Sequence, residues 1–379
     1  MKRTLNHNEV SDTGKKRCDE AESKDEEITA LEFFSGVGGL RFGLETAFAN
    51  TKTKVKVLAA FDINTAANTV YARSFGHNPS TKSVESLSPA AIDALGITRI
   101  WLLSPPCQPF TRGGSERDHL DNRSRPLLHL IESMPALKHK PEFFFLENVP
   151  NFEKSECRNR LVACLQRLGY TYSEYIVSPL QFGITNDRKR YYLAATKISD
   201  SKDIAEPNLS LDLITQWPPN GDTAVSVRPL SHYLQQDLDD VTPFLLPPQY
   251  ITKHPTFRFD IVRPDSVRSS TITKAYGTKM VTRAGSFLQT KNMHITEPNF
   301  KDNASILELG LRFLTPIEIA RLHAFPIEID LTEDEKTNKN KHRLVFPPSI
   351  TIAQQYKLLG NSLNVKVIAE LMRQSFCFK

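Results

Sequence analysis

The residue best suited to chemistry in this sequence is Cys107, in the segment 104–112, which reads Ser-Pro-Pro-Cys-Gln-Pro-Phe-Thr-Arg. Three prolines around the cysteine restrict the backbone and so fix the direction of the thiol. The segment follows a short apolar run, Ile100 to Leu103, which reads as a buried strand. Because ligands of open α/β sheets bind beyond the carboxyl ends of the strands, a thiol there is placed for nucleophilic catalysis. The alternative is a small buried side chain that only fills space.

Two further segments carry charged groups that suit a heterocyclic substrate. Glu147 and Asn148 end another apolar run. A carboxylic acid there can protonate or hydrogen-bond N3 of a pyrimidine, which makes C6 electrophilic, and burial would raise its pKa and keep it protonated. Arg188 and Arg190 lie two residues apart at the start of a predicted strand, so they point the same way and suit a phosphate or a base carbonyl. The alternatives are a helix-capping glutamate and a solvated charged hairpin.

A glycine-rich turn over residues 35–39 follows the first predicted strand, and Asp62 follows the second. Glycines let the backbone approach a ligand, and the next helix presents free N–H groups at its start. Asp62 is placed to accept hydrogen bonds from ribose hydroxyls. The turn departs from the dinucleotide pattern Gly-x-Gly-x-x-Gly, so a methyl donor fits at least as well as NAD. A tight turn with no ligand is the alternative.

These segments need a scaffold that brings strand ends together. Strand-like and helix-like patterns alternate from residue 28 to 200, which predicts an α/β fold with a largely parallel sheet. Predicted strands cover 28–34, 55–61, 100–103, 143–146, 170–177 and 190–195. Thr315 and Pro316 predict the start of a later helix. We therefore expect a tail over 1–27, a catalytic domain over 28–200, a smaller irregular domain over 201–310, and a return to the catalytic domain over 311–379 with an exposed loop over 327–348.

Composition excludes several classes of protein. Of 379 residues, 40% are hydrophobic, and none of the apolar runs approaches the roughly 18 residues of a membrane helix. Five scattered cysteines argue against a disulfide framework, and Cys157 with Cys164 are expected to be buried or idle thiols rather than a zinc site. The net charge of +5 permits an anionic partner without requiring one. The basic run 15–17 could address the nucleus, although a solvated basic run explains it better.

Taken together, these motifs resemble the cytosine-5 methyltransferases. The shared features are Pro-Pro-Cys-Gln, Glu-Asn-Val, the segment from Gln181 to Arg190, and Gly-Asn-Ser-Leu-Asn-Val over 360–365, in the order that the family has them. The resemblance implies a Rossmann-like, class I S-adenosylmethionine-dependent methyltransferase with a mostly parallel seven-stranded sheet and a small target-recognition domain. Segments 104–112, 121–123, 314–316 and 360–365 closely resemble the type-2 DNA methyltransferase homologues, a branch that methylates cytosine 38 of tRNA-Asp.

One segment departs from that branch. Its recognition domain usually carries Cys-Phe-Thr before a lysine, whereas Thr271 and Ile272 stand in place of the cysteine and phenylalanine here.

The resemblance also implies roles for individual residues. Cys107 would add to cytosine C6 while Glu147 stabilises protonated N3, with Arg188 and Arg190 as further catalytic residues that help populate the thiolate. The cofactor would be S-adenosyl-L-methionine, held by Phe33, Phe34, Gly36, Val37, Gly38, Gly39, Asp62, Ile63, Glu85, Ser104, Pro105, Asn361, Ser362 and Val365. The substrate would contact Gln108, Arg112, Asn148, Lys274 and Tyr276. No metal ligand set is expected.

The expected partner is tRNA, in whose anticodon loop the bases are already exposed. We expect a monomer, without membrane attachment, in the cytoplasm, the nucleus or both. A DNA cytosine-5 methyltransferase is the nearest alternative, followed by a catalytically silent nucleic-acid-binding protein. A cysteine hydrolase that pairs Cys107 with His119 or His129 would leave the glycine-rich turn unexplained.

Overall fold

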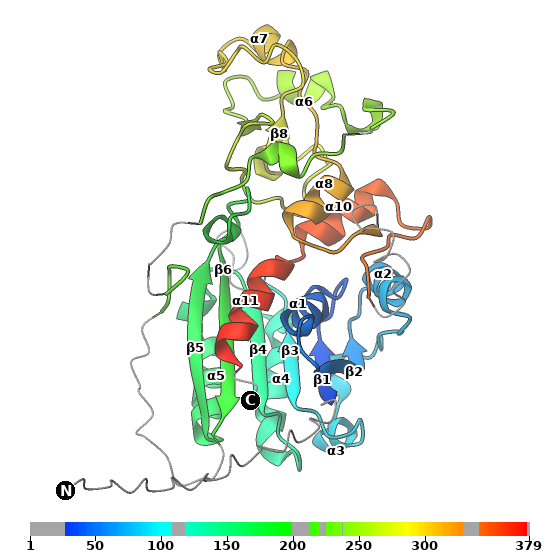
Figure 1. Cartoon of the computed structure of the whole chain (residues 1–379), viewed down its shortest axis with the longest axis vertical. Helices are drawn as coiled ribbons and strands as arrows, with labels where there is room; N and C mark the ends of the chain where they lie inside the picture. The colour runs from blue at the N-terminus through cyan, green and yellow to red at the C-terminus, as the bar shows by residue number, and fades with distance from the viewer. Residues whose placement is uncertain are drawn as a thin grey trace, which may run out of the picture.

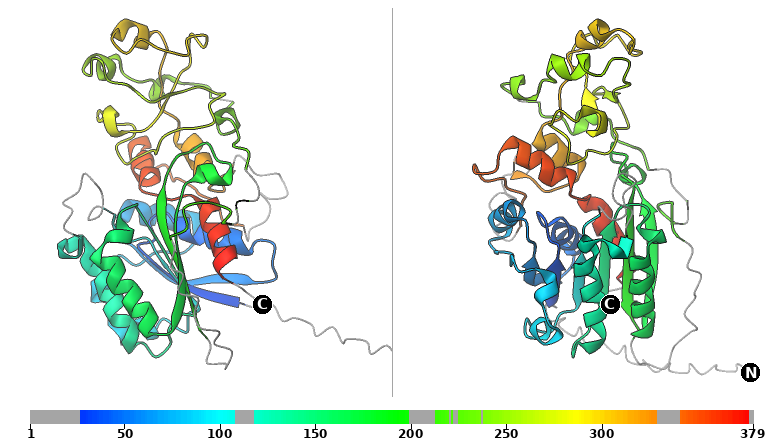
Figure 2. Two further views of the ribbon diagram at one scale, coloured as in Figure 1. Left: turned by 90° about the vertical axis from the view of Figure 1, so that its left-hand side faces the viewer. Right: turned by 180° about the vertical axis from the view of Figure 1, so that it is seen from behind.

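The computed structural model describes residues 27–107, 118–198, 213–219, 221, 225–236, 238–328 and 341–376. Its lower part in Figure 1 is a six-stranded sheet in the order β2-β1-β3-β4-β6-β5. The strands are β1 (Glu27–Phe33), β2 (Lys54–Phe61), β3 (Ile100–Leu103), β4 (Phe143–Asn148), β5 (Tyr170–Val177) and β6 (Arg190–Lys197). The predicted α/β fold is confirmed, because helices cover both faces of this sheet (Figure 2).

The sheet is mostly parallel, as predicted. β1 pairs in parallel with β2 and β3, and β3 pairs in parallel with β4. Only β6 runs the other way, antiparallel to both β4 and β5. The expected count of seven strands was wrong for the described residues. At the outer edge of β5, Ile214 forms an isolated parallel bridge with Tyr175, where a seventh strand would lie.

The two faces of the sheet follow from alternating side chains along its strands. On one face, Ile100 and Leu102 pack under α1 (Gly39–Phe48) and α11 (Val365–Ser375). On the other face, Trp101 and Leu103 pack against α4 (Arg125–Ser133) and α5 (Glu156–Arg167). A Cβ on Gly43 of α1 would lie 2.3 Å from Cγ2 of Ile368, so these two helices pack more closely than any other residue would allow. Two further helices, α2 (Thr65–Phe75) and α3 (Pro89–Asp93), follow β2 and precede β3.

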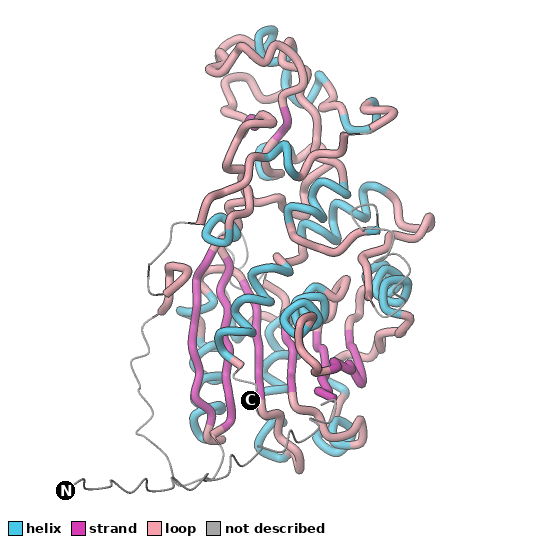
Figure 3. Tube along the Cα trace, viewed as in Figure 1, coloured by secondary structure: helices cyan, strands magenta, loops and turns pink. Residues whose placement is uncertain are grey.

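The upper part of the molecule in Figure 1 is largely loop, as Figure 3 shows. It holds α6 (Pro248–Thr252), α7 (Asn303–Leu307) and a two-stranded parallel ribbon of β7 (Ile261–Val262) and β8 (Phe287–Leu288). Here it is called the recognition region, residues 225–310. Its core is apolar despite the irregular backbone, with Ile272 and Phe287 fully buried.

Two helices lie between the recognition region and the sheet. They are α8 (Pro316–Leu322) and α10 (Ile352–Gly360), and they share a core with the recognition region. Thr315 caps α8 as predicted, since its hydroxyl accepts from the N–H of Glu318 at 3.1 Å. The loop expected to be exposed over 327–348 is described only in part. In the described part Leu344 is buried, and Nδ1 of His342 lies 2.9 Å from Oε1 of Glu45 in α1, within hydrogen-bond distance. Among the described residues no helix has the length and apolarity needed to cross a bilayer.

Candidate active site

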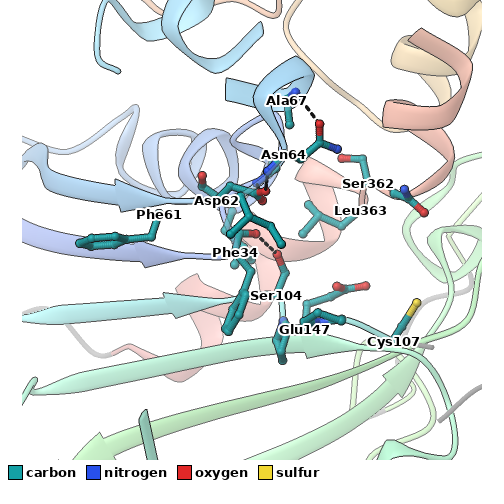
Figure 4. A pocket seen from close by; sticks show the side chains of 18 of the residues that line it. Phe34, Phe61, Asp62, Asn64, Ala67, Ser104, Cys107, Glu147, Ser362 and Leu363 are labelled. Atoms are coloured by element: carbon teal, nitrogen blue, oxygen red, sulfur yellow. Dashed lines mark hydrogen bonds between the residues drawn. The ribbon is translucent and has the colours of Figure 1, made fainter. Parts of the chain in front are cut away.

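A cavity of about 580 Å³ opens at the carboxyl ends of β1, β2, β3 and β4. The glycine-rich turn after β1, the loop after β3 that ends in Cys107, and Glu147 near the end of β4 form its walls (Figure 4). The turn after α10, with Asn361 and Ser362, closes it from the side of the recognition region. Four segments that lie far apart in the sequence therefore meet at one edge of the sheet, as the position of their strands requires.

The glycine-rich turn has a backbone that needs glycine. Gly36 and Gly38 have φ angles of +54° and +85°, in the left-handed region. A Cβ on Gly38 would lie 2.3 Å from the ring of Phe75, whereas one on Gly36 would meet open space. The carboxylate of Asp62 fixes the turn, since it accepts from the N–H of Gly36 at 2.8 Å and from that of Asn64 at 2.7 Å. Burial raises the pKa of Asp62, and these two hydrogen bonds oppose that rise.

The residues of this cavity fit S-adenosylmethionine. Its volume lies in the usual range for small-molecule sites, about 300–1,000 Å³. Each carboxylate oxygen of Asp62 keeps a lone pair for a ribose hydroxyl. The side chain of Ile63 is 74% exposed and lines the cavity, so it offers an apolar surface to a flat ring. Gly36 leaves space against the backbone for the polar end of the cofactor.

The loop that carries Cys107 is held at two points before the thiol. Ser104 donates from its hydroxyl to the carbonyl of Phe34 at 2.8 Å, which ties the loop to the glycine-rich turn. Asn148 donates from its side chain to the carbonyl of Pro105 at 3.2 Å. Cys107 itself is half-buried. Burial raises the pKa of its thiol, the charge of Glu147 raises it further, and the nearby arginines lower it by less. The resting site therefore holds a thiol, and the arginines alone do not populate the thiolate.

Glu147 faces the same cavity and pairs with Arg190. Its Oε1 lies 3.5 Å from Nε of Arg190, and both side chains are nearly buried. Burial raises the pKa of Glu147 above its ordinary value, although Arg190 and Arg188 oppose the rise. A carboxyl group with a raised pKa can hold a proton and deliver it to a ring nitrogen. In Figure 4 the carboxyl group of Glu147 lies between Cys107 and the cofactor side of the cavity.

Arg188 and Arg190 both line the cavity, but their guanidinium groups have different bonding partners. Arg190 pairs with Glu147. Arg188 is completely buried, and its guanidinium donates to the backbone carbonyls of Ile272, Gly360 and Ser362. Burial and the charge of Arg190 lower the pKa of Arg188 to about 9. The two arginines, which were predicted from their spacing to point the same way, therefore bond to different partners.

Most residues predicted for the cofactor line the cavity: Phe34, Gly36, Val37, Gly39, Asp62, Ile63, Glu85, Ser104, Pro105, Asn361 and Ser362. Phe33 and Gly38 lie behind this wall, with Phe33 stacked on Phe61 at 5.5 Å. Val365 is also behind it, buried in the core with its N–H bonded to the carbonyl of His323.

The structure contradicts two of the predicted substrate contacts, and the others stay predictions. Tyr276 is a correction: it is buried, and its hydroxyl donates to the carbonyl of Ser286 at 2.6 Å and accepts from the N–H of Leu314. Asn148 is also a correction, because its side-chain amide donates to the carbonyl of Pro105 rather than to the substrate. Lys274 is exposed on the recognition region. Gln108 and Arg112 lie outside the described residues.

Asn64 and Arg123 are among the polar residues of the cavity wall that sequence reasoning missed. Asn64 caps α2, and its position two residues after Asp62 was a usable signal. Arg123 forms a bidentate pair with Asp121, at 2.8 and 2.6 Å, near the mouth of the cavity. In the sequence, the segment 121–123 stands out only through its resemblance to the type-2 branch.

Comparisons with known proteins agree with this geometry. The family of C-5 cytosine-specific DNA methylases matches residues 28–377. A DNA (cytosine-5)-methyltransferase of Dictyostelium discoideum is 34% identical over 92% of this chain and 94% of its own. The human tRNA (cytosine(38)-C(5))-methyltransferase is 33% identical over 92% of this chain and 99% of its own. The crystal structure of the S. pombe Dnmt2 methyltransferase superposes with a TM-score of 0.72 at 28% identity, over 92% of this chain and 98% of that one. The chain thus belongs to the C-5 cytosine methyltransferase family, whose methyl donor is S-adenosylmethionine.

Proposed function

We propose that this protein methylates C5 of a cytosine in tRNA, with cytosine 38 in the anticodon loop of tRNA-Asp as its target. The observation that carries the reaction is the meeting of Cys107, Glu147 and Arg190 in one cavity with the glycine-rich turn. Relatives described as tRNA (cytosine(38)-C(5))-methyltransferases, from human and from Schizosaccharomyces pombe among others, support tRNA as the substrate. A target in a loop also costs less to extrude than one in a duplex.

The mechanism begins with proton transfers that the site can direct. Glu147 donates its proton to N3 of the cytosine, and Arg190 stabilises the carboxylate that remains. The Cys107 thiol loses its proton to solvent, and its sulfur bonds to C6, so the ring electrons move toward C5 and N3. S-adenosylmethionine, when bound, supplies the electrophilic methyl group that C5 takes up. The C5 proton passes to solvent and the Cys107 thiolate is eliminated, which restores the aromatic ring, and N3 returns its proton to Glu147.

The raised pKa of Cys107 does not prevent these steps. In the empty site burial and Glu147 both disfavour the thiolate. Once the bound base holds the proton at N3, its positive charge adds to that of the arginines and offsets the carboxylate of Glu147 near the sulfur. The nucleophile is therefore strengthened when a substrate is present, and the resting thiol is protected from oxidation.

DNA is the second candidate substrate, because the relative from Dictyostelium discoideum is described as a DNA methyltransferase. The deciding experiment supplies the full-length protein with labelled S-adenosylmethionine and either total tRNA or DNA, and maps 5-methylcytosine by bisulfite sequencing. Label at cytosine 38 of tRNA-Asp supports the proposal, and label in DNA alone refutes it. Label in neither favours a silent binding protein. The Cys107→Ala variant serves as control, since it is expected to bind the cofactor and transfer no methyl.

The expectation that the protein is a monomer stays a prediction from sequence. The assignment to the cytoplasm, the nucleus or both stays a prediction from sequence.

A further inference from the structure

The buried guanidinium of Arg188 joins three parts of the molecule. Its Nη1 donates to the carbonyl oxygen of Ile272 at 2.8 Å, and its Nη2 donates to that of Gly360 at 3.0 Å and to that of Ser362. Ile272 belongs to the recognition region, whereas Gly360 and Ser362 belong to the turn that lines the cofactor side of the cavity. The backbone of Arg188 itself stands just before β6, next to the paired Arg190 and Glu147.

The segment around Ile272 is fastened to the same place by its backbone. The N–H of Asp187 donates to the carbonyl of Ser269 at 2.7 Å, and the hydroxyl of Thr271 donates to the carbonyl of Asp187 at 2.8 Å. The side chain of Asn186 donates to the carbonyl of Ser270 at 3.0 Å. Residues 269–273 thus run beside 185–188 as an added strand-like segment, and they cannot shift independently of Arg188.

Gly360 completes the junction. A Cβ at this position would lie 2.4 Å from both the carbonyl carbon and the oxygen of Thr273, so the bare α-carbon packs directly on that peptide group. A movement of the turn that holds Asn361 and Ser362 must therefore move the segment 269–273, because no flexible side chain lies between them to absorb it.

We propose that Arg188 is a positioning residue that couples the cofactor cavity to the recognition region, so that the cofactor and the target RNA each strengthen binding of the other. Arginine suits this role because its planar fork can hold several carbonyls at fixed angles. Coupling of this kind is reciprocal by thermodynamic necessity. The inference rests on the proposed function for the identity of the RNA alone.

The same geometry accounts for the departure of Thr271 and Ile272 from the branch pattern. Ile272 is fully buried, and what it gives to Arg188 is its backbone carbonyl. The hydroxyl of Thr271 is bonded to Asp187. In this chain the segment therefore works through its backbone, and a change of side chain is tolerated if the core stays filled.

The first test needs no variant. Amide hydrogen exchange is measured on the full-length protein with and without S-adenosylhomocysteine, which is the demethylated cofactor. The N–H groups of Ser270 and Thr273, bonded to Ser286 and Ala284, are expected to exchange at least about 5-fold more slowly with the ligand bound, at the lower limit of typical coupling. Unchanged exchange at both amides, together with slowed exchange in the glycine-rich turn, would overturn the coupling.

The second test compares Arg188→Met with a matched control. Arg268→Met removes an arginine from the same seam, where Arg268 is 57% exposed and pairs with Asp187 at 3.1 Å. The dissociation constant of S-adenosylhomocysteine is measured with and without tRNA-Asp, after thermal unfolding has shown that each variant is folded. We expect tRNA to tighten binding about 5-fold or more in the wild type and in Arg268→Met, and not at all in Arg188→Met.

An Arg188→Met variant that keeps the full effect of tRNA refutes the inference, and loss of turnover with that effect retained would make Arg188 catalytic instead. If that variant does not fold, the hydrogen-exchange result decides. In the wild type, tRNA could leave the cofactor affinity unchanged while the cofactor analogue still slows hydrogen exchange at the amides of 269–273. That result supports the coupling and refutes the choice of tRNA.

Discussion

The exchange Glu147→Gln tests the proton that the mechanism assigns to this carboxyl group. Glutamine keeps the size of the side chain and can donate a hydrogen bond to N3, but it cannot transfer a proton. General acid catalysis contributes about 10²- to 10⁴-fold, so kcat should fall by that factor, which corresponds to about 3–5 kcal/mol of activation free energy. Cofactor affinity should stay unchanged, because Glu147 acts on the base rather than on the ribose.

The structure also sets the side effects of this variant. At 3.5 Å, with an effective dielectric constant of about 20, the attraction between Glu147 and Arg190 is about 5 kcal/mol before desolvation is subtracted. Removal of one partner of a buried ion pair costs about 3–5 kcal/mol, and because the amide oxygen still accepts from the guanidinium, the free energy of unfolding should fall by no more than that. Removal of the charge also removes one of the two causes that raise the pKa of Cys107. The thiol should therefore react faster with iodoacetamide near neutral pH.

The assay follows methyl transfer to tRNA and, separately, alkylation of the peptide that contains Cys107 by mass spectrometry. Glu142→Gln is the matched control, because Glu142 precedes β4 at its opposite end and its side chain is 52% exposed. Activity that falls while thiol reactivity rises supports the reasoning. An unchanged kcat would refute the acid role of Glu147, and a slower alkylation would refute the electrostatic account of the thiol.

Three further perturbations have expected outcomes. Gly38→Ala would place a methyl group 2.3 Å from the ring of Phe75, on a residue whose φ is +85°. We therefore expect the free energy of unfolding in denaturant to fall by about 1–3 kcal/mol, and the affinity for S-adenosylhomocysteine to weaken. An unchanged unfolding midpoint would be inconsistent with this packing. Asn148→Ala frees the carbonyl of Pro105, and kcat should fall more than cofactor affinity; equal losses in both would argue against a role in holding the thiol loop. Burial raises the pKa of Glu32 from 4.5 to about 7. Between these two pKa values the native state retains a proton that the unfolded chain has lost. The free energy of unfolding therefore falls as the pH rises from 4.5 to about 7, by at most about 3 kcal/mol. Glu32→Gln should flatten this pH dependence in urea titrations, and an unaltered slope would rule out Glu32 as its source.

The local parts of the site could be predicted from sequence. The prolines around Cys107, the glycines of the turn and the acid that follows β2 each have a meaning that their own neighbours supply. Their meeting was also predictable, because the carboxyl ends of parallel strands converge at one edge of a sheet. The α/β fold, which was predicted from the alternation of strand and helix patterns, was confirmed.

The partners of the polar residues between these motifs follow from the three-dimensional fold and not from the local sequence. Arg188 donates to carbonyls 84 and 172 residues away along the chain, and the hydroxyl of Tyr276 accepts from the N–H of Leu314, which is 38 residues away. Nothing in the local pattern distinguishes Arg188 from Arg190, since both have the spacing of neighbours on one side of a strand. The topology alone places carbonyl oxygens around the first and a carboxylate beside the second. A buried polar group takes whatever partner the packing provides, and that partner is a property of the whole fold.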